Sequence, residues 1–253
     1  MKRLFILSLL MNLCISKNTF AQQFFDKATV EFEVKTNVKK SMGNSSWAER
    51  MKDMLPQFKT SYYTYTFTGN KSIYQFSHWE TNSKLPPFLK GSDEASKWYV
   101  DHNTGTMQMK KDVFGTVFDI EDSLTNIKWK YTNESRVIAG FNCRKAVGVM
   151  MDSVYVFAFY TDELMISGGP CSINGLPGMV LGVTIPRLYA SWMATKVNVT
   201  SVNENVVTPL SGKKKYSLTE TGKLIVDRTK EWVDSGDPSG TNWVDQLKWS
   251  VML

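Results

Sequence analysis

Histidine is scarce in this sequence of 253 residues, which holds only His78 and His102. Catalytic triads of the Ser-His-Asp type and most zinc centres depend on histidine side chains, so the sequence offers little material for either chemistry. The motifs Gly-x-Ser-x-Gly and His-Glu-x-x-His, which mark serine hydrolases and zinc proteases, are absent from it. Composition and motifs therefore give no argument for an enzyme.

Long apolar stretches are also lacking. The longest covers residues 4–15, and about 12 residues is too short for the roughly 20 that a bilayer core demands. It follows a basic Met-Lys-Arg start, and Thr19 and Ala21 then place small residues where a signal peptidase reads them. We predict that residues 1–21 are a cleaved signal peptide, that the protein is exported to the periplasm or outer membrane, and that the mature chain has no transmembrane segment.

A strong excess of one charge is missing once that segment is removed. The whole chain carries 30 lysines and arginines against 24 acidic residues, a formal net charge of +6. Three of the basic residues lie within residues 1–21, so the mature chain has 27 against 24, a net charge of +3. The run Lys213-Lys214-Lys215 is interpreted as a solvated loop, because nucleic-acid-binding proteins carry a basic stripe interleaved with stacking aromatics. A nucleic-acid partner is therefore not expected.

Aromatic residues are abundant, with 8 Trp, 10 Tyr and 14 Phe, and many follow the two-residue period of β-strands. Residues 28–39 alternate between apolar and polar side chains, which predicts a half-buried strand. Residues 63–67 and 73–76 flank Gly69-Asn70, a pattern typical of a hairpin. Further strands are expected at residues 98–100, 107–109, 113–120, 127–131, 147–160, 179–185 and 191–199.

Residues 147–160 are the most apolar of these segments, and we predict that they form one strand. Because both of its faces are apolar, this strand is either covered on both sides or lines a cavity. Two aromatic faces are candidates for lining an apolar ligand site: Tyr155, Phe157 and Phe159, and Tyr63, Tyr65 and Phe67. The alternative, that both faces are plain core, stays open.

These strands and turns predict a mainly β protein with a curved, half-barrel-like antiparallel sheet and one or two short helices against its concave side. Helices are expected at residues 46–55 and around residues 224–232. Residues 22–210 are assigned to a β-rich domain, and residues 211–253 to a C-terminal extension packed on the same domain. The architecture looks like the half-barrel of periplasmic lipoprotein-carrier proteins, a likeness that does not fix function.

The sequence Gly-Pro-Cys-Ser-Ile-Asn-Gly-Leu-Pro-Gly-Met-Val-Leu at residues 169–181 resembles the signature of the GLPGLI family. Two segments upstream, residues 140–146 and 159–163, resemble that family's "G-aromatic-x-C-x-K-A" and "W-Y/F-T-x-E" segments. The resemblance covers residues 140–183 and implies an exported protein of a kind known mainly from Bacteroidetes. It implies no defined activity.

The segment Gly175-Leu176-Pro177-Gly178 also has a purely structural interpretation. Pro177 fixes φ at about −65° and suits the second position of a turn, while Gly178 supplies the positive φ of the third. Leu176 is driven toward an extended conformation by the proline that follows it. We therefore predict a tight turn that begins the strand of residues 179–185. The alternative is a nest of backbone N–H groups that grips an anion, but no Gly-Lys-Ser/Thr follows to open a helix.

Cys143 and Cys171 are the only cysteines after residue 21, and an exported protein meets an oxidising compartment. We predict a disulfide between them, which would stabilise the fold by about 3 kcal/mol through the loop that it closes. A zinc site formed by the two thiols with His78 and His102 is the alternative. The close ligand pairs that are typical of zinc sites are missing from the sequence.

Methionine is frequent, with 13 in the chain. Met107, Met109, Met150 and Met151 offer soft thioether ligands suited to Cu(I). Methionines that fill gaps in a core follow the same spacing, and we favour that interpretation. No metal or other cofactor is expected.

Three functions are compatible with these features. The first is a non-catalytic envelope binding or accessory protein whose apolar, aromatic-lined concave face takes a hydrophobic small molecule or a lipid. The second is an interaction module that docks on an outer-membrane transport or secretion protein through an exposed sheet edge or the Trp-rich C-terminal segment. The third and least favoured is a hydrolase of envelope polymers with Asp119, Glu121 and Asp122 as its carboxylates, although such a run between strands is more often a solvated turn.

Overall fold

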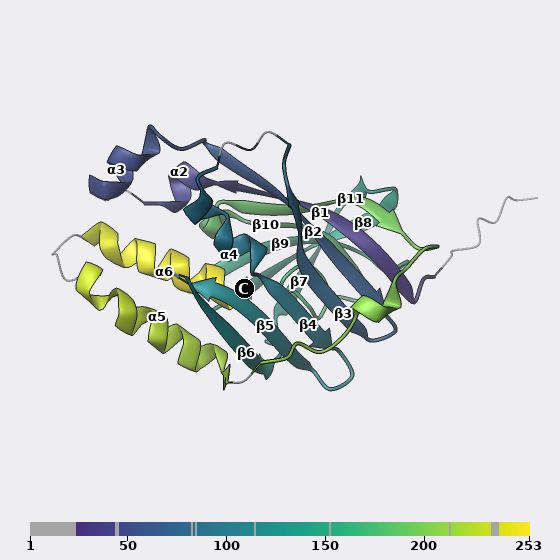
Figure 1. The fold of residues 1–253 in the computed structure, drawn as a ribbon. Helices are drawn as coiled ribbons and strands as arrows, with labels where there is room; N and C mark the ends of the chain where they lie inside the picture. Colours follow the sequence, from purple (N-terminus) through teal and green to yellow (C-terminus); the bar gives the residue numbers. More distant parts are fainter. Residues whose placement is uncertain are drawn as a thin grey trace, which may run out of the picture.

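We describe the protein from a computed structural model, which covers residues 24–253 except 44–45, 82, 84, 114, 152, 213 and 234–237. The predicted signal peptide at residues 1–21 lies outside the described residues. One sheet of twelve strands dominates the described part of the chain (Figure 1). The expected mainly β fold with a curved, largely antiparallel sheet is confirmed.

In chain order the strands are β1 (Lys27–Asn37), β2 (Phe58–Thr68), β3 (Lys71–Trp79), β4 (Lys97–Asp101), β5 (Thr106–Val113), β6 (Thr116–Ser123), β7 (Lys128–Ile138), β8 (Phe141–Met150), β9 (Val154–Thr161), β10 (Met179–Ile185), β11 (Ala190–Asn198) and β12 (Lys215–Tyr216). Their order across the sheet is β12-β6-β5-β4-β3-β2-β1-β11-β10-β9-β8-β7. Strand β12 runs parallel to β6, and the other neighbours are antiparallel. Because β1 pairs with both β2 and β11, it joins the N-terminal strands to the later ones.

The α-helices are α2 (Val38–Ser41), α3 (Ser46–Lys52), α4 (Gly91–Glu94), α5 (Leu218–Val233) and α6 (Pro238–Met252), and the 3-10 helices are η1 (Pro87–Leu89), η2 (Pro186–Leu188) and η3 (Glu204–Val206). The two expected helices are therefore present as α3 and α5. Figure 1 shows α5 and α6 side by side as a pair next to β6. None of the helices in the described ranges is long and apolar enough to cross a membrane.

A capping box explains why α5 begins where it does. The backbone N–H of Glu220 donates a 3.1 Å hydrogen bond to Ser217 Oγ. The Glu220 carboxylate in turn accepts a 2.8 Å hydrogen bond from the Ser217 backbone N–H. Two N–H groups that have no partner within the helix are thus satisfied.

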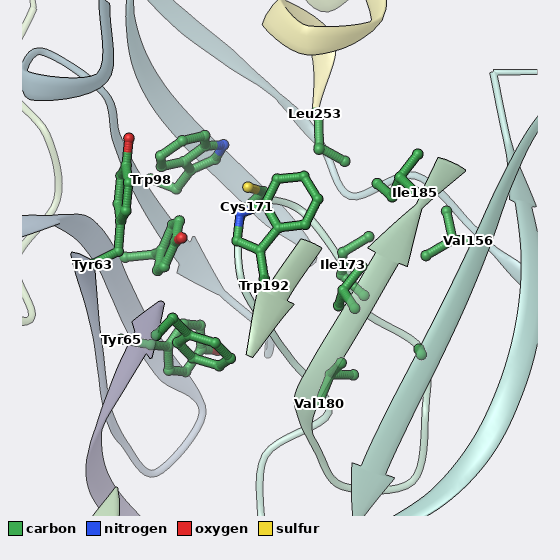
Figure 2. Close-up of a cluster of buried hydrophobic side chains, with 14 of the residues drawn as sticks. Tyr63, Tyr65, Trp98, Val156, Cys171, Ile173, Val180, Ile185, Trp192 and Leu253 are labelled. Carbon is green, nitrogen blue, oxygen red and sulfur yellow. The ribbon is translucent and has the colours of Figure 1, made fainter. Parts of the chain in front are cut away.

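Alternation along the strands gives the sheet one apolar face, as β1 illustrates. Val30, Phe32 and Val34 are at most 6% exposed, whereas the glutamates between them face the other side. We call the face of the buried set the inner face and the opposite one the outer face. Because the sheet is strongly curved, inner-face side chains from distant strands belong to one buried cluster, which includes both Tyr65 of β2 and Val180 of β10 (Figure 2).

The connection from β9 to β10, residues 162–178, also lies on the inner side. Leu164, Ile166, Cys171 and Ile173 are at most 6% exposed, and Figure 2 shows the last two within the buried cluster. The concave side is therefore filled by this loop as well as by the C-terminal segment, and not by short helices alone.

The prediction of one strand over residues 147–160 is wrong. Strands β8 and β9 pair there as an antiparallel hairpin. Met151 adopts a left-handed conformation with φ 48°, and the Ser153 N–H donates a 2.9 Å hydrogen bond to its carbonyl. Alternating apolar residues continue on both sides of the turn, so the periodicity alone hides it. The predicted strand at residues 113–120 is likewise interrupted, at Gly115 with φ 76°.

Candidate functional site

An aromatic wall covers the inner face of β2, β3 and β4. Tyr63 stacks on Tyr74 with 4.9 Å between ring centroids, and Tyr74 lies 5.1 Å from Trp98. These rings, together with Tyr65 and Phe67, are at most 4% exposed. The predicted face of Tyr63, Tyr65 and Phe67 thus points to the concave side, and it is buried there. We call these five residues the aromatic wall.

The loop of residues 162–178 packs directly onto the aromatic wall. A Cβ atom added at Gly168 would lie 2.4 Å from Tyr65 Oη, so a residue without a side chain is needed at this contact. Cys171 follows in a left-handed conformation with φ 59°. Its side chain lies near Trp98 and Trp192 in Figure 2. The space in front of the wall is therefore occupied by the protein's own side chains.

Residues 249–253, which we call the tail plug, close the same interior. Trp249, Val251 and Leu253 are each at most 8% exposed. The backbone N–H of Ser172 donates a 3.0 Å hydrogen bond to the Leu253 carbonyl oxygen. Figure 2 shows the Leu253 side chain beside Ile185 in the buried cluster.

A buried lysine lies where the aromatic wall meets the tail plug. Lys111 of β5 is 8% exposed, and its Nζ lies 4.0 Å from the centroid of the Trp98 ring. The same Nζ donates a 3.3 Å hydrogen bond to the carbonyl oxygen of Ser250. Burial lowers the pKa of Lys111 to about 8, because the charged ammonium is poorly solvated.

A carboxylate within electrostatic reach of Lys111 is already paired. Asp93 of α4 forms an ion pair with Lys59 and accepts a 3.1 Å hydrogen bond from Tyr63 Oη. Both side chains of the Asp93–Lys59 pair are less than 20% exposed. Lys111 has no ion-pair partner of its own among the residues that the structure describes.

Three polar atoms of the wall, Tyr65 Oη, Tyr74 Oη and Trp98 Nε1, lack a hydrogen-bond partner in the described part of the chain. Leaving such an atom buried costs about 1–3 kcal/mol, so each one calls for an explanation. Burial raises the pKa of Tyr74 well above its ordinary value, Cys171 and Asp93 add to the rise, and the Trp192 indole opposes it. The Trp192 indole does so without completing a hydrogen bond to Tyr74 Oη. The wall is thus well packed but incompletely hydrogen-bonded.

The predicted disulfide is wrong, because Cys143 and Cys171 are both free thiols in the structure. Gly148 of β8 pairs with Val156 of β9, and Val156 projects into the inner cluster of Figure 2 together with Cys171. Cys143 lies an odd number of residues from Gly148 in the same strand, so it occupies the outer face. The sheet therefore separates the two thiols. Burial raises the pKa of Cys171 to about 12, although Lys111 lowers it.

The second predicted aromatic face, that of Tyr155, Phe157 and Phe159, lies on the outer face of β9 and does not line the concavity. The alternation itself is as predicted, but Val156 is the residue that points inward. Tyr155 is 57% exposed, and Phe159 is buried beneath the guanidinium of Arg136, 3.9 Å from its ring centroid. This face is covered by cations and solvent, which differs from the expected ligand surface.

The predicted tight turn at Gly175-Leu176-Pro177-Gly178 is present and leads into β10 at Met179. Its hydrogen bond runs from the Gly178 N–H to the Leu176 carbonyl at 2.8 Å, so the turn is a three-residue turn centred on Pro177. Gly175 and Gly178 both have positive φ, 85° and 133°. A Cβ atom at Gly178 would lie 2.0 Å from the carbonyl oxygen of Thr161, so packing alone requires glycine there. The turn needs no anion to explain it.

Two of the three acidic residues proposed for a hydrolase, Glu121 and Asp122, attach the C-terminal extension to β6, and the third pairs with a lysine of β5. Glu121 forms an ion pair with Lys215 of β12, which lowers the pKa of Glu121. Asp122 accepts a 2.9 Å hydrogen bond from the first backbone N–H of α5, and Asp119 lies 3.3 Å from the ammonium of Lys110. These contacts are structural, so the geometry gives the hydrolase no support.

The candidate metal ligands do not converge. His78 stacks on the Tyr62 ring at 4.6 Å, whereas His102 lies 3.3 Å from the Ser72 hydroxyl with a pKa that burial lowers to about 4. The sheet separates the two thiols, and the described residues contain no group of His, Cys, Asp or Glu side chains that could hold a metal ion. Three of the four candidate copper ligands are buried core side chains: Met107, Met109 and Met150.

Strand β7 is an exposed edge of the sheet. Tyr131 and Val137 are 56% and 67% exposed, and a bulge near Tyr131 interrupts the pairing with β8. Lys128 and Lys130 lie on the same strand, and lysines and bulges are typical of edges that resist pairing with another chain. Trp249 of the Trp-rich C-terminal segment is buried. Neither feature favours docking through this edge or that segment.

Sequence reasoning missed the residues that make the interior unusual, above all Lys111, Tyr74 and Trp98. A signal for Lys111 exists, because Met107, Met109 and Lys111 share one face of β5 by the two-residue period. A lysine in phase with two buried methionines points inward. No sequence pattern could have shown that Tyr74 and Trp98 would lack hydrogen-bond partners.

No family model matches the chain, and no curated protein matches it either. Among solved structures, two of PNGF-II match with 15% and 12% identity and TM-scores of 0.49 and 0.48, over 77% and 79% of this chain. An uncharacterised conserved protein from Thermus thermophilus matches with 8% identity and a TM-score of 0.35, over 75% of this chain and 90% of its own. This chain spans only 32% and 33% of the two PNGF-II chains. Likeness at this level carries no argument about function.

Proposed function

We propose that the protein is an exported, non-catalytic envelope protein that binds a molecule with an apolar chain inside the half-barrel. The resemblance of residues 140–183 to the GLPGLI family and the predicted signal peptide at residues 1–21 both support export. The binding role rests on one observation, the buried and unpartnered polar atoms of the inner wall: Tyr65 Oη, Tyr74 Oη and Trp98 Nε1.

An aromatic wall that served only as core would gain from losing these polar atoms. Phenylalanine in place of Tyr74 would keep the ring contacts and remove a buried hydroxyl that costs about 1–3 kcal/mol. A ligand oxygen placed between Tyr74 and Trp98 would accept the indole N–H and the phenol O–H together. Unpartnered donors beside an apolar wall are therefore the features of a site for an apolar molecule with a polar end.

The tail plug is the segment whose departure would make room for such a molecule. Exposing Trp249, Val251 and Leu253 would cost about 2 kcal/mol for each side chain, or about 6 kcal/mol together. A ligand chain of about twelve methylenes gains about 0.8 kcal/mol for each CH₂ that it buries, or about 10 kcal/mol. Burial of such a chain is thus large enough to offset the exposure of the plug and to contribute to the cost of association.

Native mass spectrometry of the mature protein with 1-dodecanol tests this function. We expect a complex of one alcohol per chain, and tighter binding by a variant that ends at Lys248 and therefore lacks the tail plug. Val226 of α5, which is 38% exposed, provides a control. The substitution Val226→Ser should leave the binding unchanged.

Thermal unfolding followed by circular dichroism establishes that the truncated variant still folds. If it does not, Leu253→Ser replaces it as a milder opening of the plug. Failure of 1-dodecanol to bind the full chain and every folded plug variant would show that the interior is core and nothing more.

A further inference from the structure

The charge on Lys111 lacks a counter-charge of its own. The charged and titratable groups around it are Asp93 from α4, Lys59 from β2 and Cys171 from the loop of residues 162–178. Asp93 is held by Lys59 and Tyr63, and Cys171 is a neutral thiol because burial raises its pKa to about 12. Among the described residues, Lys111 is therefore a buried cation that is held by a carbonyl oxygen and a ring and not by an anion of its own.

The end of α6 stands where an anion would be expected. The Ser250 carbonyl accepts the hydrogen bond from Lys111 Nζ at 3.3 Å, and the Leu253 carbonyl accepts the one from Ser172 N–H at 3.0 Å. The last turn of a helix carries a partial negative charge of about half an electron. The tail plug thus presents oxygen atoms and partial negative charge to a lysine and a backbone N–H. The Trp98 indole N–H, beside the same lysine, has no acceptor in the described part of the chain.

We propose that the interior site selects amphiphiles with an anionic oxygen head group, carboxylate or phosphate, which pairs with Lys111 when the tail plug withdraws. This inference rests on the proposed function and adds the class of ligand to it. The head group would take over the hydrogen bonds that Lys111 and Ser172 now give to the plug, and it would supply the acceptor that Trp98 lacks. The apolar chain would follow the aromatic wall. An anionic head group adds a charge–charge attraction to Lys111 that a neutral carbonyl lacks, so a charged head group competes with the plug better than a neutral one does.

Three probes with twelve carbon atoms each separate the contribution of the head group from that of the chain: laurate, dodecyl phosphate and 1-dodecanol. We expect laurate, dodecyl phosphate or both to bind the wild-type protein about 10- to 100-fold more tightly than 1-dodecanol, the range for one charge-assisted hydrogen bond. A preference for one of the two anions identifies the head group. Binding constants would be measured by isothermal titration calorimetry at pH 6.5.

Lys111→Met removes the ammonium and keeps an unbranched apolar side chain. It should abolish the preference for the anions and leave the binding of 1-dodecanol unchanged, whereas Lys111→Arg should retain the preference. Lys110→Met is the matched control, because Lys110 is the adjacent residue of β5 and its side chain, 33% exposed, pairs with Asp119. The control should keep the full preference.

A second arm needs no variant. Because the pKa of Lys111 is about 8, the wild-type preference for the anions should largely disappear at pH 9.5, while the binding of 1-dodecanol should stay constant. Equal affinity for all three probes at pH 6.5, or an equal loss of preference in Lys110→Met, would overturn the inference and leave the proposed function standing. Failure of all three probes to bind would overturn both.

Discussion

Two sets of aromatic residues with the same sequence pattern lie on opposite faces of the sheet in this protein. Tyr63, Tyr65 and Phe67 lie on the inner face of β2, and the other set, at residues 155–159, lies on the outer face of β9. The outer rings are covered by cations, with Arg136 over one ring at 3.9 Å and a lysine over another at 5.6 Å. The inner rings are covered by the protein's own loop and tail.

The two faces differ in whether their charged and polar groups have partners. On the outer face the lysine over Phe157, Lys145, also forms an ion pair with Glu134, so its charge is balanced. On the inner face Lys111 lies over Trp98 without an ion pair among the described residues, and the indole N–H of Trp98 has no acceptor there. Aromatic content therefore does not distinguish the two faces from each other, whereas unbalanced polar groups do.

The most severe way to break this comparison is to displace the loop that fills the inner face. Gly178→Ala places a Cβ atom 2.0 Å from the backbone oxygen of Thr161, at a φ of 133°. We expect a loss of about 5 kcal/mol or more in the free energy of unfolding, enough to prevent folding. Gly140→Ala is the control, since its φ is also positive at 88° but no atom lies within 4 Å of the added Cβ. It should cost only about 1 kcal/mol in urea unfolding, and an equal cost for both would contradict the close packing of the turn.

The two faces should also differ in what their aromatic rings contribute to stability. Phe67 is fully buried, so Phe67→Ala should lower the free energy of unfolding by about 3–5 kcal/mol. Tyr155 is 57% exposed, and Tyr155→Ala should change it by no more than about 0.5 kcal/mol. Urea unfolding of both variants, followed by circular dichroism, measures the difference. Similar losses would mean that the inner and outer faces are wrongly assigned.

The sequence predicts the strands well because a two-residue period reports directly which residues share a face. It correctly separates Tyr155 from Val156, for example, but it does not say which of the two points into the concavity. That choice depends on the direction in which the whole sheet curves. Curvature is a property of twelve paired strands and leaves no local mark on any one of them.

Contacts between residues that are far apart in the chain are the other feature that the sequence does not predict. Cys143 and Cys171 are 28 positions apart. Two cysteines in an oxidising compartment predict a disulfide, yet the sheet lies between them. The turn at Gly178, in contrast, is predicted correctly because proline and glycine fix backbone angles locally. The contact between Lys111 and the tail plug joins residues 139 positions apart and could not be inferred.

The pH dependence of the free energy of unfolding tests whether the charge on Lys111 at the inner face is unbalanced. Lys111 has a pKa of about 8 when folded and 10.5 when unfolded, so below pH 8 both states are charged and the buried charge destabilises the fold. Between pH 8 and 10.5 the folded state loses this proton first, and the penalty disappears. Relative to Lys111→Met, the free energy of unfolding of the wild type should therefore rise by up to about 3 kcal/mol over this range.

Urea unfolding of both proteins at pH 7, 8, 9 and 10 measures this difference. The buried thiols Cys143 and Cys171, whose pKa values are raised to about 12, destabilise the fold above pH 9. The effect of Cys143 is the same in both proteins and cancels in the comparison. Lys111 itself lowers the pKa of Cys171, so Cys171→Ala is introduced into both proteins to remove that contribution. A difference that stays flat with pH would show that Lys111 is better solvated than its position indicates.

The smallest expected effect lies on the outer face. Arg136 covers the Phe159 ring at 3.9 Å, and a cation–π contact of this kind contributes about 0.5–1 kcal/mol. A double-mutant cycle with Arg136→Met and Phe159→Leu isolates that contribution, because both replacements keep apolar bulk. We expect a coupling energy of about 0.5–1 kcal/mol and no change in the binding of laurate. Altered binding would mean that the outer face contributes to the site, and the contrast between complete and incomplete aromatic faces would then fail.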